Sequence, residues 1–330
     1  MKKIKLLNFA FFALLGALVS CNDDEDATEQ RTVKPVITAG VVDFTVNEGE
    51  TVTINLTTDK AYQEDMDLKL ELVGGTGSFR DYVTSGDETI IDDGYGVIGH
   101  KITFPAYTTS MSFDITPLFD LDAEDTEVFE FRLYGMGNSN GIVAASSEMI
   151  TVTVNNSTSD NVEIYVDWSQ EYYDDFGTLQ TPEYLGTDDE THAFCDMDFD
   201  LEVYDNGGAV LLDSYTSCPE HITIDASYPD MAYFIVPSLW ELSGTESAEY
   251  MDFDVKVTVA KPGIWKDEIH MFNWNTADGG AVEGNPDAYV LSHVLVKSGT
   301  TYDLYNADFD LVASGRGANV INSIPKKTSK

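Results

Sequence analysis

Basic residues are scarce in this chain, whereas acidic ones are abundant. Its 330 residues include 18 Lys and Arg against 58 Asp and Glu, for a formal net charge of −40 at pH 7. A field of this sign repels phosphate groups and anionic lipid headgroups and attracts divalent cations, while neutral ligands are still allowed. We therefore exclude nucleic acid as a partner and keep Ca²⁺ open as a cofactor.

Residues and motifs typical of catalysis are also rare. The chain has 3 Cys and 5 His, and it lacks a Gly-x-Ser-x-Gly elbow, a His-Glu-x-x-His helix and a phosphate-binding glycine loop. Paired carboxylates can hydrolyse glycosidic bonds, but in a chain this acidic nearly any pair would qualify. We expect no enzyme activity, and a secreted hydrolase or hydrolase accessory is the third hypothesis for function.

Long apolar runs are absent after the N-terminal segment. The run from Ile4 to Val19 follows a basic start and falls short of the ~20 residues that a membrane-spanning helix requires. It is typical of a secretory signal, and Cys21 directly after Ser20 can accept a diacylglycerol. We predict a lipoprotein signal peptide over residues 1–20 and a membrane anchor through lipid on Cys21.

The segment after Cys21 is acidic and has no apolar periodicity. Residues 21–34 begin with Asn22–Asp26 and predict a disordered tether. The run resembles the acidic export signal of surface lipoproteins in Bacteroidetes-type bacteria, which implies an outer-membrane lipoprotein exposed at the cell surface. A plain spacer on a periplasm-facing lipoprotein is the alternative. At the other end, residues 317–330 form a polar tail.

Short alternating runs dominate the rest of the chain. Val52–Leu56 and Ile150–Val154 place apolar and polar side chains in turn, as half-buried strands do. No later stretch has a convincing helical period, so the pattern predicts an all-β protein of two tandem antiparallel β-sandwiches. A polar break at Asn155–Asn161 separates a first sandwich over 35–157 from a second over 160–316.

The first of these segments resembles a Calx-β domain. The matching pieces, in order, are Val42–Glu50, Arg80–Tyr82, Ile102–Pro105 and Glu127–Leu133, with an acidic loop before the last. This resemblance implies a seven-stranded immunoglobulin-like sandwich. The second segment is similar, over a few residues, to jelly-roll accessory domains of secreted bacterial proteins, which implies a jelly-roll-like sandwich.

Calx-β domains that bind Ca²⁺ do so at one end of the sandwich. The resemblance carries three of their ligand positions to this chain, as Glu48, Asp120 and Glu124. A hard cation needs about six to eight oxygens, which must converge from separate loops. The terminal aspartate run of the family is replaced here by Asn155-Asn156, which offers carbonyls without charge. A solvated acidic loop without metal is the alternative.

A hairpin is predicted at the centre of the second segment, because Asn206-Gly207 is a strong signal for a two-residue turn. A turn at these two residues would place Leu201 opposite Leu212 and Cys195 opposite Cys218. Both pairs would lie on one apolar face, and directly opposed residues are separated by a distance that suits a disulfide.

The two cysteines leave three interpretations open. An exported location permits a Cys195–Cys218 disulfide. The same register would also set His192 opposite His221, which suggests a zinc site, although residues three apart on a strand point to opposite faces. Free buried thiols are the third interpretation.

The other face of this hairpin carries a row of carboxylates. Asp198 and Asp200 project there, with Asp213 predicted across the hairpin from Asp200. Like charges so close repel each other unless a cation lies between them, so these three residues are a second candidate Ca²⁺ site. A solubilising row on an edge strand is the alternative.

Aromatic side chains gather in the second half of the chain, where all 4 Trp lie. Sugar sites stack pyranose rings on aromatic faces and bind hydroxyl groups with Asp and Asn side chains. A Trp in a sandwich is otherwise typical of the core, and Trp168 is the one that we expect there. The candidate glycan residues are Trp240, Trp265, Trp274, Asn273, Asn275, Tyr172 and Tyr173.

These features favour a non-catalytic, outer-membrane-anchored lipoprotein that binds an extracellular polysaccharide, another polymer or a surface protein through its second sandwich. An adhesion or structural module that needs Ca²⁺ for rigidity is the alternative.

Overall fold

The computed structural model describes residues 33–89, 94, 96–137, 139–174, 178–242, 244, 246–278 and 280–315. The predicted signal peptide, Cys21, the tether up to residue 32 and the polar tail over 317–330 lie outside the described residues. The described part of the chain contains no helix that is both long and apolar enough to cross a membrane.

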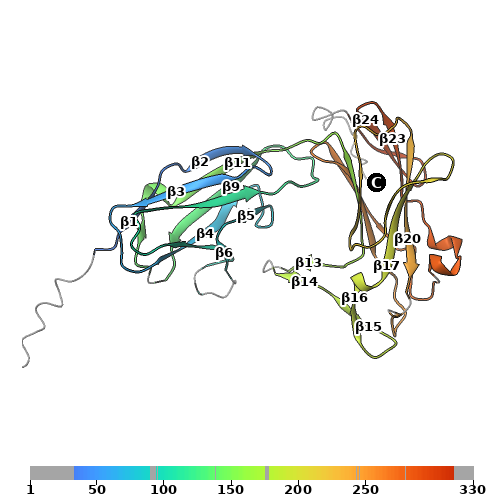
Figure 1. Ribbon diagram of the computed structural model, residues 1–330, viewed down its shortest axis with the longest axis horizontal. Helices are drawn as coiled ribbons and strands as arrows, with labels where there is room; N and C mark the ends of the chain where they lie inside the picture. The colour runs from blue at the N-terminus through green and yellow to red at the C-terminus, as the bar shows by residue number, and fades with distance from the viewer. Residues whose placement is uncertain are drawn as a thin grey trace, which may run out of the picture.

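The described residues form two β-sandwiches, each around its own hydrophobic core (Figure 1), which confirms the predicted all-β fold. In the first sandwich, one sheet has the strand order β10-β1-β3-β8-β5 and the other β2-β11-β9-β4-β7-β6. Its strands are β1 (Val36–Ala39), β2 (Asp43–Asn47), β3 (Val52–Thr58), β4 (Met66–Gly75), β5 (Tyr82–Thr84), β6 (Asp87–Glu88), β7 (His100–Phe104), β8 (Ser110–Pro117), β9 (Glu127–Gly135), β10 (Ile142–Val143) and β11 (Met149–Asn155), with a 3-10 turn, η1 (Ala145–Ser147).

The first sandwich is not antiparallel throughout, which corrects the prediction. β1 pairs in parallel with β10, and β2 pairs in parallel with β11. The reason is that the N-terminal segment changes sheets near Gly40, whose backbone N–H donates to the Asn55 carbonyl at 3.1 Å. Both sheets therefore gain an edge strand from one continuous segment.

The second sandwich has a sheet of order β19-β12-β21-β22 and a sheet of order β18-β17-β20-β23-β24-β25, in which all pairings are antiparallel. Two small hairpins, β13–β14 and β15–β16, extend from it (Figure 1). Its elements are β12 (Val162–Asp167), β13 (Tyr172–Tyr173), β14 (Leu179–Gln180), β15 (Glu183–Leu185), β16 (Thr191–Ala193), η2 (Phe194–Asp196), β17 (Asp198–Tyr204), β18 (Val210–Ser214), β19 (Glu220–Ile224), β20 (Ala232–Glu241), β21 (Val255–Lys261), β22 (Trp265–Met271), η3 (Ala281–Glu283), η4 (Pro286–Ala288), β23 (His293–Ser298), β24 (Thr301–Asn306) and β25 (Leu311–Gly315).

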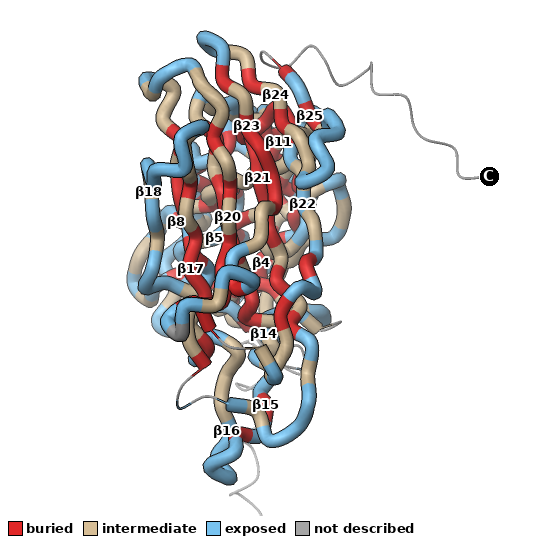
Figure 2. The backbone as a smooth tube through the Cα atoms, turned by 90° about the vertical axis from the view of Figure 1, so that its right-hand side faces the viewer, coloured by how far each residue is buried: buried red, intermediate tan, exposed pale blue. Residues whose placement is uncertain are grey.

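Strand β17 lies at the centre of the second core. Phe199, Leu201 and Val203 are all fully buried, so the apolar face predicted for this hairpin is the core face. Figure 2 shows buried residues along β17, β20 and β21, whereas the β15–β16 hairpin is largely exposed. The alternate residues of β17 must then project from the outer face of the sheet.

The β17–β18 hairpin does not have the predicted register. Val203 pairs with Leu212, two positions beyond the expected partner. The turn is longer than an Asn-Gly pair because the Asp205 carboxylate accepts the backbone N–H of Gly207 at 2.7 Å, and Gly208 adopts a left-handed φ of 79°. The turn moves the pairing by one position, as Tyr204 opposite Val210 shows, and a bulge between Val203 and Tyr204 adds the second.

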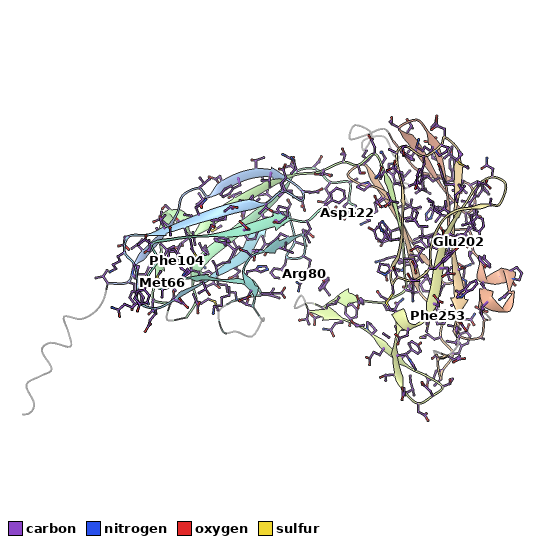
Figure 3. All side chains as sticks on the ribbon, viewed as in Figure 1. Met66, Arg80, Phe104, Asp122, Glu202 and Phe253 are labelled. Atoms are coloured by element: carbon purple, nitrogen blue, oxygen red, sulfur yellow. A yellow bond between two sulfur atoms is a disulfide. The ribbon has the colours of Figure 1, made fainter. Side chains whose placement is uncertain are left out.

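The two sandwiches contact each other beside the segment that links them. Lys266 of β22 forms an ion pair with Asp122 of the first sandwich. The Arg80 guanidinium lies 4.6 Å from the ring centroid of Tyr173 in β13. Figure 3 shows Asp122 and Arg80 on the side of the first sandwich that faces the second.

Candidate functional site

A depression of about 370 Å³ lies on the outer face of β17 and β20 in the second sandwich. Its lining combines three carboxylates with two aromatic rings, and Glu202 among them is labelled in Figure 3. The carboxylates come from alternate positions of β17, which a strand turns to one face. The lining residues are Asp198, Asp200, Glu202, Tyr215 and Trp240.

Asp200 is the most buried of these carboxylates. It lies directly opposite Ser238 of β20, which in turn bridges to Tyr289. Asp200 is 6% exposed, and within the part of the chain that the structure describes no hydrogen-bond donor reaches its carboxylate. The Ser238 hydroxyl is fully buried and also lacks a partner there. Asp200 thus lines the depression without a hydrogen-bond partner among the described residues, beside a second unsatisfied polar group that is buried behind it.

Glu202, by contrast, is fixed by two tyrosines. The Tyr215 hydroxyl donates to Glu202 Oε1 at 2.7 Å, and the Tyr204 hydroxyl donates to Oε2. Burial and these bonds raise the pKa of both phenols above their usual value, so the phenols remain donors. The carboxylate therefore keeps a fixed orientation at the floor of the depression.

The charges around Asp200 are all negative. Burial raises its pKa to about 7, and repulsion from Asp198, Glu220, Glu202 and Asp213 adds to this shift. Asp198 also has a raised pKa, because it is partly buried. None of these carboxylates forms an ion pair with a Lys or Arg among the described residues. The depression therefore carries negative charge that no Lys or Arg among the described residues neutralises.

A second depression of about 330 Å³ adjoins the first and shares Asp198 with it. It adds two more carboxylates, Asp196 and Glu241, to the same row. We call the two depressions together the acidic groove. Two adjoining depressions suit a chain-like ligand better than a single small molecule. The other residues that line the second depression are Trp168, Cys195, Met197, Thr216, Ser217 and Cys218.

The segment Gly280–Tyr289, which we call the rim segment, contains η3 and η4 and packs beside β20 (Figure 1). Its Tyr289 bridges to Ser238, the cross-strand neighbour of Asp200, although none of its residues lines the two depressions. Trp274 holds the rim segment, because the indole Nε1 donates to the Ala288 carbonyl at 2.8 Å. At Gly280 a side chain would collide with the Trp240 carbonyl, 2.2 Å from where its Cβ would be, so only glycine allows this close approach.

Of the three candidate glycan tryptophans, Trp240 alone lines the groove. Trp265 and Trp274 are 7% and 1% exposed, so the prediction that they offer ring faces to a sugar is wrong. Trp274 packs edge-on against Phe199 with ring centroids 5.4 Å apart, because the loop after β22 folds back over the core. Trp168 is buried, as expected.

The remaining candidate glycan residues lie elsewhere. Asn273 is exposed, and Asn275 organises its own turn by accepting the Ala277 backbone N–H at 2.8 Å. Tyr172 and Tyr173 are exposed on β13, where Tyr173 stacks against Arg80. None of these four lines the acidic groove.

Cys195 and Cys218 form a disulfide with their Cα atoms 5.6 Å apart. The bond lies beyond the paired part of β17 and β18, in the wall of the groove. The predicted pairing of His192 with His221 is wrong, because His192 lies in the β15–β16 hairpin, whereas His221 lies in β19, which pairs with β12. His192 contacts Asp188 and His221 contacts Glu163, so the geometry offers no zinc site from these four residues.

An acidic cluster lies at one end of the first sandwich. One carboxylate oxygen each from Asp120, Asp122 and Glu124 lies within 4.8 Å of the others. Glu48 is buried next to them, and its Oε2 accepts the Ser157 N–H at 3.0 Å. Sequence reasoning missed Asp122, although the alternation of acids through this loop would have revealed it.

Among the residues that the structure describes, Lys266 alone forms an ion pair with the acidic cluster. Burial raises the pKa of Glu48 and of Asp120, and repulsion from neighbouring acids adds to both shifts. Burial and a hydrogen bond with Glu124 raise the pKa of Glu127 to about 8. These shifts are what carboxylates show when they are crowded together without a cation.

The second candidate Ca²⁺ site does not form as predicted. Asp213 lies opposite Glu202 rather than Asp200, as the longer turn and the bulge together require. Among the described residues, Asp198, Asp200 and Asp213 do not bring three ligand oxygens within 4.8 Å of one another. These three carboxylates are therefore not arranged to hold one ion together.

Comparison with known proteins adds little. No known family and no curated protein matches the sequence. The apo form of the Calx CBD1 domain matches 38% of this chain and 99% of its own at 17% identity and a TM-score of 0.28. The calcium binding domain CBD12 of CALX1.1 matches 68% of this chain and 79% of its own at 14% identity and a TM-score of 0.27. Likeness at TM-scores this low carries no argument about function.

Proposed function

We propose that this protein is a non-catalytic binding protein, anchored to the outer membrane by lipid on Cys21, whose second sandwich binds an extracellular polysaccharide in the acidic groove. The observation that carries the proposal is the partly exposed Trp240 indole beside Asp198, Asp200 and Glu202 in one depression. Sugar rings stack on such a face while carboxylates accept hydrogen bonds from hydroxyl groups.

The shape of the groove supports a polymer. The two adjoining depressions have volumes of about 370 and 330 Å³, within the range of small-ligand sites, and they share Asp198. The Cys195–Cys218 disulfide stiffens one wall and Trp274 holds the rim segment. A site built on strands and tied in this way needs little reordering when a ligand binds.

Affinity electrophoresis through gels that contain soluble polysaccharides tests this function. We expect at least one polysaccharide to retard the protein, and Trp240→Ala to abolish the retardation. Phe272→Ala, which removes an exposed aromatic ring outside the groove, is the matched control. No retardation by any polysaccharide contradicts the proposal, and release of reducing ends from the polymer would favour a hydrolase instead.

The acidic cluster favours a second function, a structural module that Ca²⁺ rigidifies. Its residues fit this ion, because three carboxylates already converge and their neighbour Glu48 is buried with a raised pKa. Asp120, Asp122 and Glu124 would hold the ion, which would neutralise their repulsion. Lys266 of the second sandwich already supplies one positive charge to this cluster through its ion pair with Asp122.

A further inference from the structure

The composition of the acidic groove is unusual for a site that binds a neutral sugar. Three carboxylates line the main depression, and Asp196 and Glu241 extend the row into the next. A neutral sugar gains hydrogen bonds from such groups but cannot offset their mutual repulsion. A ligand that carries positive charge removes the repulsion and gains the attraction.

The arrangement of the acids favours spaced charges rather than one metal ion. The groove carboxylates do not bring three ligand oxygens within 4.8 Å of one another, whereas those of the acidic cluster do. Outward residues along β17 are separated by ~7 Å. A polymer with a charged group on successive units can follow such a row.

The rings around the acids favour an ammonium group in particular. Trp240 and Tyr215 line the depression. Tyr289 lies beside Ser238, and its pKa is raised by burial first and then by the nearby charges of Glu202 and Asp200. Aromatic faces combined with carboxylates are the environment in which proteins bind ammonium groups.

We propose that the ligand of the acidic groove is an amino-bearing polysaccharide, a hexosamine chain with free amines, and that the buried carboxylate of Asp200 binds one ammonium group of it. This inference rests on the proposed function and names its ligand class.

Isothermal titration calorimetry with three tetramers of the same linkage tests the inference on the full-length protein. The probes are a glucosamine tetramer, its N-acetylated form and the corresponding glucose tetramer, all at pH 7, where part of the free amine is charged and Asp200, with a pKa of about 7, is partly ionised. We expect the glucosamine tetramer to bind about tenfold or more tightly than the others, since a buried charge-assisted contact is worth ~1.5 kcal/mol or more.

Two matched variants separate a specific contact from general attraction to an acidic protein. Asp200→Asn, which keeps the shape, should reduce binding of the glucosamine tetramer to the level of the neutral ones. Asp308→Asn makes the same charge change at an exposed position outside the groove and should leave binding unchanged. Equal losses in the two variants would overturn the inference.

Other outcomes distinguish this inference from the proposed function. If all three tetramers bind equally and Trp240→Ala abolishes their binding, the amine preference is wrong but the polysaccharide site stands. If no tetramer binds, the amine preference is wrong, and the polysaccharide gels decide whether the proposed function stands. If Trp240→Ala changes nothing, both fail. If a lysine tetramer binds as tightly as the glucosamine tetramer, the inference that the ligand is a polysaccharide is overturned in favour of a basic peptide.

Discussion

Asp200 of β17 and Ser238 of β20 are direct cross-strand neighbours, and neither side chain has a hydrogen-bond partner within the described residues. Both are more than nine-tenths buried. An unpaired buried polar group costs ~1–3 kcal/mol of stability. The pair therefore marks a place where the sheet is less stable than its packing would allow, next to a groove that a ligand can fill.

Substituting Ser238→Ala should raise the free energy of unfolding by about 1 kcal/mol, because it removes a buried hydroxyl without a partner. Urea denaturation followed by tryptophan fluorescence measures the change. Ser292→Ala is a useful control, since the Ser292 hydroxyl donates to the Ile235 carbonyl at 3.0 Å and its loss should destabilise the protein. Destabilisation by Ser238→Ala would mean that the hydroxyl has a partner.

The stability of the second sandwich should depend on the protonation of Asp200. Its pKa is raised from 3.8 to about 7, so the folded state binds this proton more tightly than the unfolded state. The resulting stability is fully present below the unfolded pKa and is lost as the pH rises toward 7. Asp198, Glu202, Asp213 and Glu220 face the same carboxyl and strengthen the effect.

Asp200→Asn should abolish most of this pH dependence. We expect the variant to match the wild type near pH 4 and to be more stable above pH 7 by ~1 kcal/mol, after allowance for solvent screening. Thermal melts across this pH range measure the difference. If the wild type were instead more stable than the variant at high pH, the surroundings of Asp200 would stabilise its ionised form.

The core tryptophan and the groove tryptophan should respond differently to truncation. Trp274→Ala removes a buried indole and should cost ~3–5 kcal/mol. Trp240→Ala removes a partly exposed ring and should cost well under half as much, because less apolar surface leaves the interior. Chemical denaturation of both variants tests this assignment, and similar losses would place Trp240 in the core.

Removal of the disulfide should destabilise the second sandwich. The Cys195–Cys218 bond spans 23 positions, and closing a loop of that length is worth ~3 kcal/mol through the unfolded chain. We expect the free energy of unfolding of the Cys195→Ala/Cys218→Ala double variant to be lower by this amount. The variant should therefore unfold at a lower denaturant concentration. Mass spectrometry before and after reduction provides the check on the wild type. No gain of two protons would contradict the bond.

Calcium should raise the melting temperature of the first sandwich. At a concentration 100-fold above its dissociation constant, an ion that binds only the folded state adds ~2.7 kcal/mol. Asp122→Asn should remove most of this gain, because Asp122 belongs to the acidic cluster, whereas Asp213→Asn should not. Melts with excess Ca²⁺ and with chelator make the comparison, and identical midpoints in the wild type would exclude the ion.

Part of this molecule is predictable from local sequence. The alternation around Phe199 and Leu201 indicates both a strand and its buried face, because the side chains of a strand alternate whatever surrounds it. The register is not predictable in this way. It depends in part on whether the Asp205 side chain bonds to the following N–H groups, which the Asn-Gly signal does not reveal.

The groove is less predictable than the strands, because its parts come from distant segments. Trp274 stands between two asparagines and is nevertheless buried, because the loop after β22 folds over the core, whereas Trp240 follows a leucine in β20 and is partly exposed. Asp200 is buried by Ser238 and by its neighbour Tyr289, which lie far along the chain. No local pattern contains that information.

The bond from Trp274 to the rim segment has a consequence for how this protein can diversify. The indole donates to a main-chain carbonyl, at Ala288, so the tie does not depend on the side chains of the rim segment. Exposed positions of the rim segment, such as Val282 and Asp287, can therefore be replaced while the backbone of the segment keeps its position beside β20. A library randomised at these positions would therefore vary the surface beside β20 while the pair of sheets stays unchanged.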